Sequence, residues 1–84
     1  MINCTFANLR QLLLDLGFEM KVVPDSHVVF EHGPAHARLV TEPFADGETV
    51  DPATIAVVGR NLDERGILPR ARFDELLRER ALAG

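Results

Sequence analysis

The residues best suited to chemistry are a serine and a histidine that stand side by side, Ser26 and His27. A histidine side chain ordinarily titrates at about pH 6.5, so it can accept or donate a proton near neutral pH. His27 opens the β-branched and aromatic run Val28-Val29-Phe30, directly after the turn residues Pro24 and Asp25. A side chain at the point where a turn becomes a strand is held firmly and still reaches solvent. His27 is therefore the first candidate for an acid–base residue.

A metal site and a serine nucleophile are two further interpretations of the same stretch, and both are weaker. His27, His32 and His36 invite a metal site, but His27 and His32 alternate to opposite faces of a strand and no cysteine pattern supports them. We expect no metal, and we expect His32 and His36 to be surface residues flanking a turn. The same alternation would point Ser26 away from His27, so a serine nucleophile activated by its neighbour is not expected.

The elements that must position His27 begin with a helix over residues 5–16. Thr5 is its predicted N-cap, and Gly17 ends it because glycine adopts the left-handed conformation at no steric cost. Its apolar stripe recurs at three- and four-residue steps and comprises Phe6, Leu9, Leu13 and Leu16, widened by Leu12. Residues 18–23, 27–32 and 35–42 then read as three short strands on hairpin-length connections, which predicts an antiparallel meander.

A loop over residues 43–50 precedes a second helix, with Asp51 as N-cap and Pro52 as its first residue. The buried stripe of this helix is predicted to be Ile55, Val58 and Leu62, and Gly66 ends it. Gly59, in its interior, costs about 1 kcal/mol of helix propensity relative to alanine, so it favours a site of close packing.

A last helix is predicted over residues 70–83, with Phe73, Leu76 and Leu77 facing inward. Its arginines alternate with acidic residues, which indicates a solvated, salt-bridged face that includes an Asp74–Arg78 pair. The acidic residues around residues 42–51 are likewise explained by a solvated loop and an N-cap.

The predicted fold class is α+β, in the order α-β-β-β-α-α, with a three-stranded antiparallel sheet and helices packed on one face. Phe30 marks the core face of the middle strand, so His27, Val29 and Glu31 are expected on the open face. Eighty-four residues form a single domain, which is too small for a large cleft or a bulky cofactor.

Composition narrows the class of protein further. The formal net charge of −4 argues against a general polyanion binder, because such binding rests on lysine and arginine at phosphates. No apolar run is long enough to cross a membrane and no secretory signal is visible. The single cysteine, Cys4, cannot form an internal disulfide, which favours a reducing cytoplasm and a small buried residue over a reactive thiol.

The order of elements and three short motifs resemble the HicA family, small toxins of bacterial toxin–antitoxin pairs. Leu16-Gly17-Phe18 matches the way the family leaves its first helix, and Ser26-His27 matches the last two places of its Gly-Ser-His signature. Val40-Thr41-Glu42-Pro43 is similar to the end of the third strand, and residues 51–66 stand where the closing helix would be. The likeness covers residues 5–67, with residues 70–83 as an additional helix.

The resemblance implies a fold like that of double-stranded-RNA-binding domains and a metal-independent ribonuclease that cleaves messenger RNA, with His27 required for activity. An antitoxin protein would be the natural partner. The departures are Asp25 in place of the signature glycine, Phe44 where a histidine often follows the proline, and an acidic chain where the family is usually basic.

If the resemblance extends to activity, His27 would remove the proton of the ribose 2′-hydroxyl, protonate the leaving oxygen, or donate to the phosphate. Ser26 would contact a phosphate oxygen or orient the ring. Asp25 would either hold the imidazole or repel the phosphate. Lys21 and Arg38, on the two neighbouring strands, are the expected RNA-binding residues.

The alternative function is a catalytically silent adaptor that keeps the fold and binds another protein through the open sheet face or the last helix. The acidic charge and Asp25 favour this alternative. A self-associating version is also open, because Val29 is an apolar residue expected on the open face.

Overall fold

The computed structural model describes the backbone of residues 4–83 and the side chains of residues 4–80. Its element order is α1 (Phe6–Asp15), β1 (Glu19–Val23), β2 (His27–His32), β3 (Ala37–Thr41), α2 (Pro52–Glu64) and α3 (Arg70–Ala83). The strands form one antiparallel sheet in the order β1-β2-β3. The predicted α+β class and the order of its elements are therefore confirmed.

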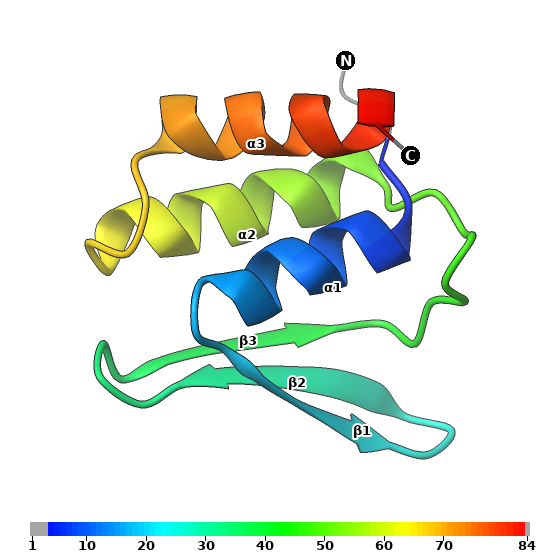
Figure 1. Ribbon diagram of the computed structural model, residues 1–84. Helices are drawn as coiled ribbons and strands as arrows, with labels where there is room; N and C mark the ends of the chain where they lie inside the picture. The colour runs from blue at the N-terminus through cyan, green and yellow to red at the C-terminus, as the bar shows by residue number, and fades with distance from the viewer. Residues whose placement is uncertain (1–3, 84) are drawn as a thin grey trace.

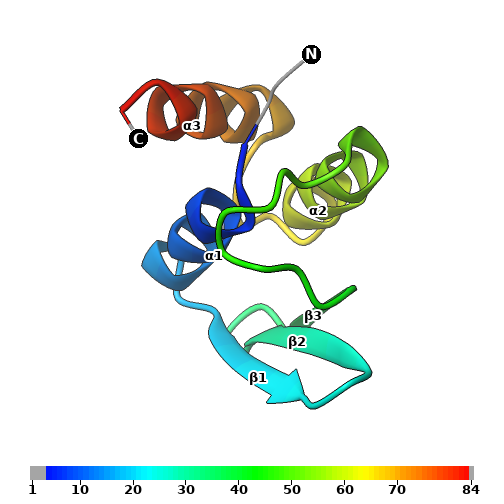
Figure 2. The ribbon, with the colours of Figure 1, turned by 90° about the vertical axis from the view of Figure 1, so that its right-hand side faces the viewer.

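The molecule is built in three layers, as Figures 1 and 2 show. The sheet forms one outer layer, α1 and α2 lie across a single face of it, and α3 packs on α1 and α2 on the side away from the sheet. The face of the sheet away from the helices, here called the outer face, is left uncovered by the described residues.

The residues at both ends of α1 form the caps that the sequence predicts. Thr5 caps α1: its hydroxyl oxygen accepts a hydrogen bond from the amide of Asn8, and the Thr5 amide donates to Oδ1 of Asn8. At the other end Gly17 has a φ of 99°, while Phe18 and Gly17 donate to the carbonyls of Leu13 and Leu14. This is a Schellman motif, and it explains why a Leu-Gly-Phe sequence ends a helix.

The strands are shorter than the sequence pattern suggests. β1 begins at Glu19 because the amide of Phe18 completes the end of α1. β3 begins at Ala37 because Ala35 and His36 belong to the turn that follows β2, where His36 has a φ of 52° and donates to the carbonyl of Gly33.

The core lies between the sheet and the helices and continues between the two helical layers. Phe30 from β2 and Leu9 from α1 are completely buried, and so are Phe73 and Leu77 from α3. Because α3 contributes two such side chains, it is part of the same core rather than a surface attachment.

At Gly59 the side chains of α3 pack directly against the backbone of α2. A Cβ atom added there would lie 2.7 Å from Nε of Arg70 and 2.8 Å from a ring carbon of Phe73. The expected close packing at this glycine is thus confirmed, and its partner is α3.

The ion pairs of α3 differ in one respect from the sequence prediction. Asp74 pairs with Arg70, one turn earlier in the helix, and not with Arg78. Arg80 crosses to α1, where its guanidinium donates to Asp15 at 2.6 Å. The remaining pairs of the helix, Arg72 with Glu75 and with Glu79, form the salt-bridged face that the alternating charges indicate.

Candidate functional site

The turn before His27 is built from residues 23–26. The amide of Ser26 donates to the carbonyl of Val23 at 3.1 Å, which closes a four-residue turn with Pro24 and Asp25 in its central positions. Asp25 has a φ of 60°. Proline followed by a residue with positive φ is the pattern of a type II turn, in which glycine is favoured and aspartate is tolerated. Asp25 therefore takes the backbone conformation that suits the glycine of the Gly-Ser-His signature.

Ser26 and His27 contact each other directly. Oγ of Ser26 lies 2.7 Å from Nδ1 of His27. The expectation that the two side chains point apart is wrong, because strand alternation applies only from His27 onward, while Ser26 still belongs to the turn. The serine hydroxyl is placed to orient the ring.

This contact determines what the ring of His27 can do. Nδ1 is occupied by the hydroxyl, so Nε2 is the nitrogen left to meet a ligand. If Nδ1 carries the proton and donates to Ser26, Nε2 is a base; if the hydroxyl donates to Nδ1, Nε2 carries a proton to give. The ring is half-buried, which holds it in place without closing it off from solvent.

Lys21 lies on the same outer face as His27, one step along the sheet. Lys21 is opposite Val29, two residues from His27, or about 7 Å along the strand. Its ammonium group is 2.8 Å from Glu31, which raises the pKa of Lys21 and lowers the pKa of Glu31 through the same hydrogen bond. The positive charge of Lys21 is thus largely balanced within the sheet.

Arg38 also lies on the outer face, but not beside His27. It is opposite Glu31, four residues along β2 from His27, or about 13 Å in the strand direction. Within one chain, therefore, the fold brings together Ser26 and His27, places Lys21 next to them and leaves Arg38 at the far end of the sheet.

A shallow hollow on the outer face lies beside Lys21. Its volume is about 310 Å³, and it is lined by Gly17, Glu19, Lys21, Glu31, Gly33 and Pro34. Two carboxylates face one ammonium group there, so this hollow does not attract phosphate.

Val29 is less exposed than the sequence predicts for an apolar residue on the outer face. It faces outward as expected but is only 4% exposed, because Lys21 and Val40 stand opposite it on the two flanking strands. The apolar side chains of this face that solvent reaches are Val40, which is 58% exposed, and Val23, which stands opposite His27 and is 40% exposed.

The other two histidines have separate environments. His32 is half-buried rather than a surface residue: Nε2 lies 3.1 Å from the carbonyl of Leu16, Nδ1 accepts from the amide of Ala35, and the ring packs on Phe18. These contacts tie β2 to the end of α1. His36 is exposed in the turn after β2. Among residues 4–80, no three histidine, cysteine or acidic side chains gather as a metal site.

Phe44, which stands where the HicA family often has a histidine, is part of the packing. Its ring stacks on Phe6 with the centroids 5.7 Å apart. Cys4 is buried, and burial raises the pKa of its thiol. Neither residue contributes to the site around His27.

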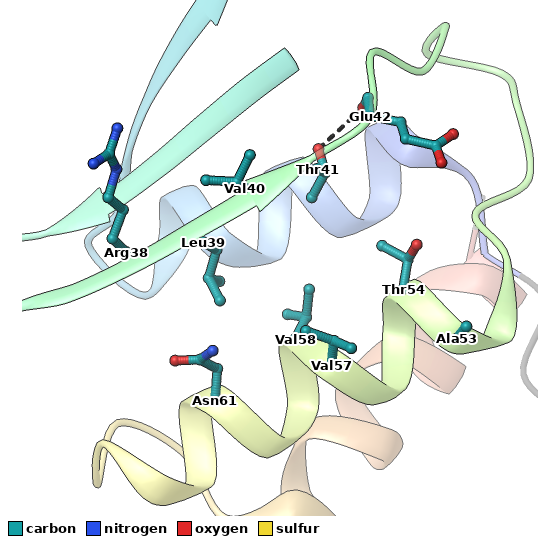
Figure 3. A pocket seen from close by; sticks show the side chains of 10 residues that line it. All are labelled: Arg38, Leu39, Val40, Thr41, Glu42, Ala53, Thr54, Val57, Val58 and Asn61. Carbon is teal, nitrogen blue, oxygen red and sulfur yellow. Dashed lines mark hydrogen bonds between the residues drawn. The ribbon is translucent and has the colours of Figure 1, made fainter. Parts of the chain in front are cut away.

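Sequence reasoning missed a groove between β3 and α2, shown in Figure 3. It has a volume of about 320 Å³ and is lined by residues 38–42 of the strand side and by Ala53, Thr54, Val57, Val58 and Asn61 of α2. Val57, which is not part of the predicted buried stripe of α2, is 52% exposed. A signal for the groove would have been that valines 57 and 58 cannot both face the sheet on one helix.

No helix within the described part of the chain is long and apolar enough to cross a membrane. No protein-family model, curated protein or solved structure matches this chain. The resemblance to the HicA family therefore rests on its motif residues and on the order of the elements.

Proposed function

We propose that this domain is a HicA-like, metal-independent ribonuclease in which His27 is the acid–base residue and Ser26 orients it. The observation that carries the proposal is the 2.7 Å contact between Oγ of Ser26 and Nδ1 of His27. It holds the imidazole on a turn whose positive φ at Asp25 suits the signature glycine.

The proposed reaction uses the 2′-hydroxyl of the RNA as the nucleophile. Nε2 of His27 takes the proton of that hydroxyl as its oxygen attacks the adjacent phosphorus, and the bond to the 5′-oxygen of the next nucleotide breaks. The departing oxygen takes a proton from water, or from His27 after the ring has accepted the proton of the 2′-hydroxyl. One RNA fragment then ends in a cyclic phosphate and the other in a 5′-hydroxyl. Lys21 is the nearest cation for the phosphate.

The surroundings of His27 predict a slow enzyme. Asp25 is exposed next to the ring, and Lys21 is already paired with Glu31. Fixed positive charge at the phosphate is usually the largest contribution to such catalysis, and it is weak here. Messenger RNA as the substrate and an antitoxin as the partner follow from the HicA resemblance.

The test compares wild type with His27→Ala on a long unstructured RNA at low salt, with a chelator present. His36→Ala is the matched control, because His36 is an exposed histidine in the next turn. We expect wild type and His36→Ala to cleave and His27→Ala to lose at least about a hundredfold in rate. Equal cleavage by His27→Ala, or none by wild type, would contradict the proposal.

A second candidate function is a catalytically silent protein-binding domain. The net charge of −4 and the exposed Asp25 favour it, because both oppose the approach of RNA. It predicts no RNA affinity at low salt and a protein complex that survives His27→Ala.

A further inference from the structure

β3 is an edge strand with room beside it. In the sheet order β1-β2-β3 it pairs with β2 on one side only. Its other side borders the groove shared with α2. An edge strand directs alternate backbone N–H and C=O groups away from its sheet, and these groups can pair with a further strand.

The side chains along this edge are self-complementary. Arg38 and Val40 point to the outer face in Figure 3, and Glu42 follows at the same two-residue spacing. Glu42 lies one residue beyond the end of β3, and the segment 38–42 reads positive, apolar, negative along this face. Turning it by 180° about Val40 sets Arg38 opposite Glu42, Val40 opposite Val40 and Glu42 opposite Arg38.

We propose that β3 pairs with β3 of a second copy of this chain, antiparallel and centred on Val40, to make a six-stranded sheet. Two Arg38–Glu42 pairs flank the two-fold axis, and opposite charges across antiparallel strands stabilise the pairing. The contact covers Val40, which is 58% exposed, and Val57 of α2, which is 52% exposed and lines the same groove.

The pairing also completes the site around His27, an inference that rests on the proposed ribonuclease function. The paired residues of β2 and β3 end at Val28 with Thr41. Continuing this register by one residue, past the end of β3, sets His27 beside Glu42. In the dimer, Arg38 of the second copy lies opposite Glu42. The row across the sheet then runs from His27 to Glu42 to an arginine of the other copy.

The dimer brings an arginine closer to His27 than a single chain does. The chain's own Arg38 is about 13 Å from His27 along the strand direction, whereas Arg38 of the second copy is two strand spacings away, or about 10 Å. The long arginine side chain spans much of that gap. Its main effect there is to offset the charge of Glu42, so the carboxylate next to His27 repels a phosphate less.

The dimer is expected to be weak. β3 has five residues, and an interface of one short strand and a valine from each helix is smaller than that of stable complexes. A dissociation constant on the order of 10–100 µM is consistent with such an area. Measurements must therefore extend to several hundred micromolar protein.

The first test is sedimentation equilibrium of wild type, Glu42→Arg, Arg38→Glu and the double variant that exchanges the two charges. We expect concentration-dependent dimers for wild type, at least about tenfold weaker association for each single variant, and recovery in the double variant. Thermal unfolding of each variant checks that the fold is retained. A monomeric wild type, or dimers indifferent to both single changes, would overturn the pairing and leave the edge to another occupant.

The second test mixes two inactive proteins, His27→Ala and Arg38→Ala, at concentrations where the wild type is dimeric. In a mixed dimer one site has His27 from one copy and Arg38 from the other. We expect recovery of at most about a quarter of the wild-type rate, because at most about half of the dimers are mixed, each has one complete site, and each lacks one of the two Arg38–Glu42 pairs. If the wild type is an active dimer but the mixture stays inactive, the shared site is wrong and the ribonuclease proposal stands; if the wild type does not cleave, the sedimentation result still decides the pairing.

Discussion

At the scale of single residues, the candidate site depends on a turn that presents one imidazole. Asp25 occupies a left-handed position, and Ser26 turns its hydroxyl onto the ring of His27. The sequence was sufficient to predict the turn and the place of His27, since proline, aspartate and serine are turn residues. It could not predict the contact of Ser26, because the direction of a side chain next to a strand depends on where the strand begins.

The conformation of Asp25 can be separated from its charge with a pair of variants. Asp25→Gly and Asp25→Val both remove the carboxylate, but only glycine adopts a φ of 60° without strain. We expect the free energy of unfolding of Asp25→Val to be about 1–2 kcal/mol lower than that of Asp25→Gly. Urea denaturation of both measures this, and equal stabilities would show that the turn does not need a positive φ. RNA affinity should rise equally in the two if the charge alone matters.

The Lys21–Glu31 pair predicts how stability depends on pH. The hydrogen bond from Lys21 lowers the pKa of Glu31 in the folded chain. A carboxyl with a lowered folded-state pKa stabilises the fold above its unfolded pKa, about 4.3, and this contribution is lost as the pH falls through the folded value. Wild type should therefore be more stable than Glu31→Gln at pH 7, and the difference should shrink as the pH falls below about 4. Denaturation midpoints from pH 3 to 7 test this; parallel profiles would contradict it.

At the scale of elements, the helices determine which face of the sheet is available. α1 and α2 cover one face and α3 closes the layer above them (Figure 2). His27, three residues before the buried Phe30 in β2, is therefore left on the outer face. Caps and apolar spacing predicted each helix. They could not show that α3 packs on both other helices, because a stripe such as Phe73 and Leu77 indicates burial without naming the partner.

Gly59 tests the packing of α3. Gly59→Ala gains about 1 kcal/mol of helix propensity, but its methyl group would collide with the buried ring of Phe73. Overpacking of this kind usually costs about 1–3 kcal/mol, so we expect a net loss of stability. Gly47→Ala is the matched control, since nothing lies within 4 Å of a Cβ there. A more stable Gly59→Ala protein would show that α3 can move away from α2.

At the scale of the whole molecule, the net charge of −4 and the absence of a dense basic face in the described residues distinguish this domain from general RNA binders. Under the proposed function, RNA recognition has to come from a few side chains around His27. The amino-acid composition and the distribution of charges along the sequence predicted both of these electrostatic features. They could not reveal that β3 is an edge strand, and the proposed pairing of Arg38 with Glu42 of a second copy depends on that position.

The salt dependence of RNA binding tests this local recognition. One or two phosphate contacts on a single strand predict that the logarithm of the association constant falls with the logarithm of salt at a slope of about −1. Fluorescence anisotropy with a labelled RNA between about 20 and 150 mM salt measures the slope. A slope of −4 or steeper would mean that a larger basic surface binds the RNA.

The most direct test of the central claim is to identify the ends of RNA cut by the wild type, with a matched RNA that carries a 2′-deoxy sugar at the cleaved nucleotide. If His27 works through the 2′-hydroxyl, the products carry a cyclic phosphate and a 5′-hydroxyl, the deoxy substrate stays intact, and His27→Ala cuts neither. Cleavage of the deoxy substrate, or the same ends produced by His27→Ala at the wild-type rate, would contradict the assignment of His27 as the catalytic residue.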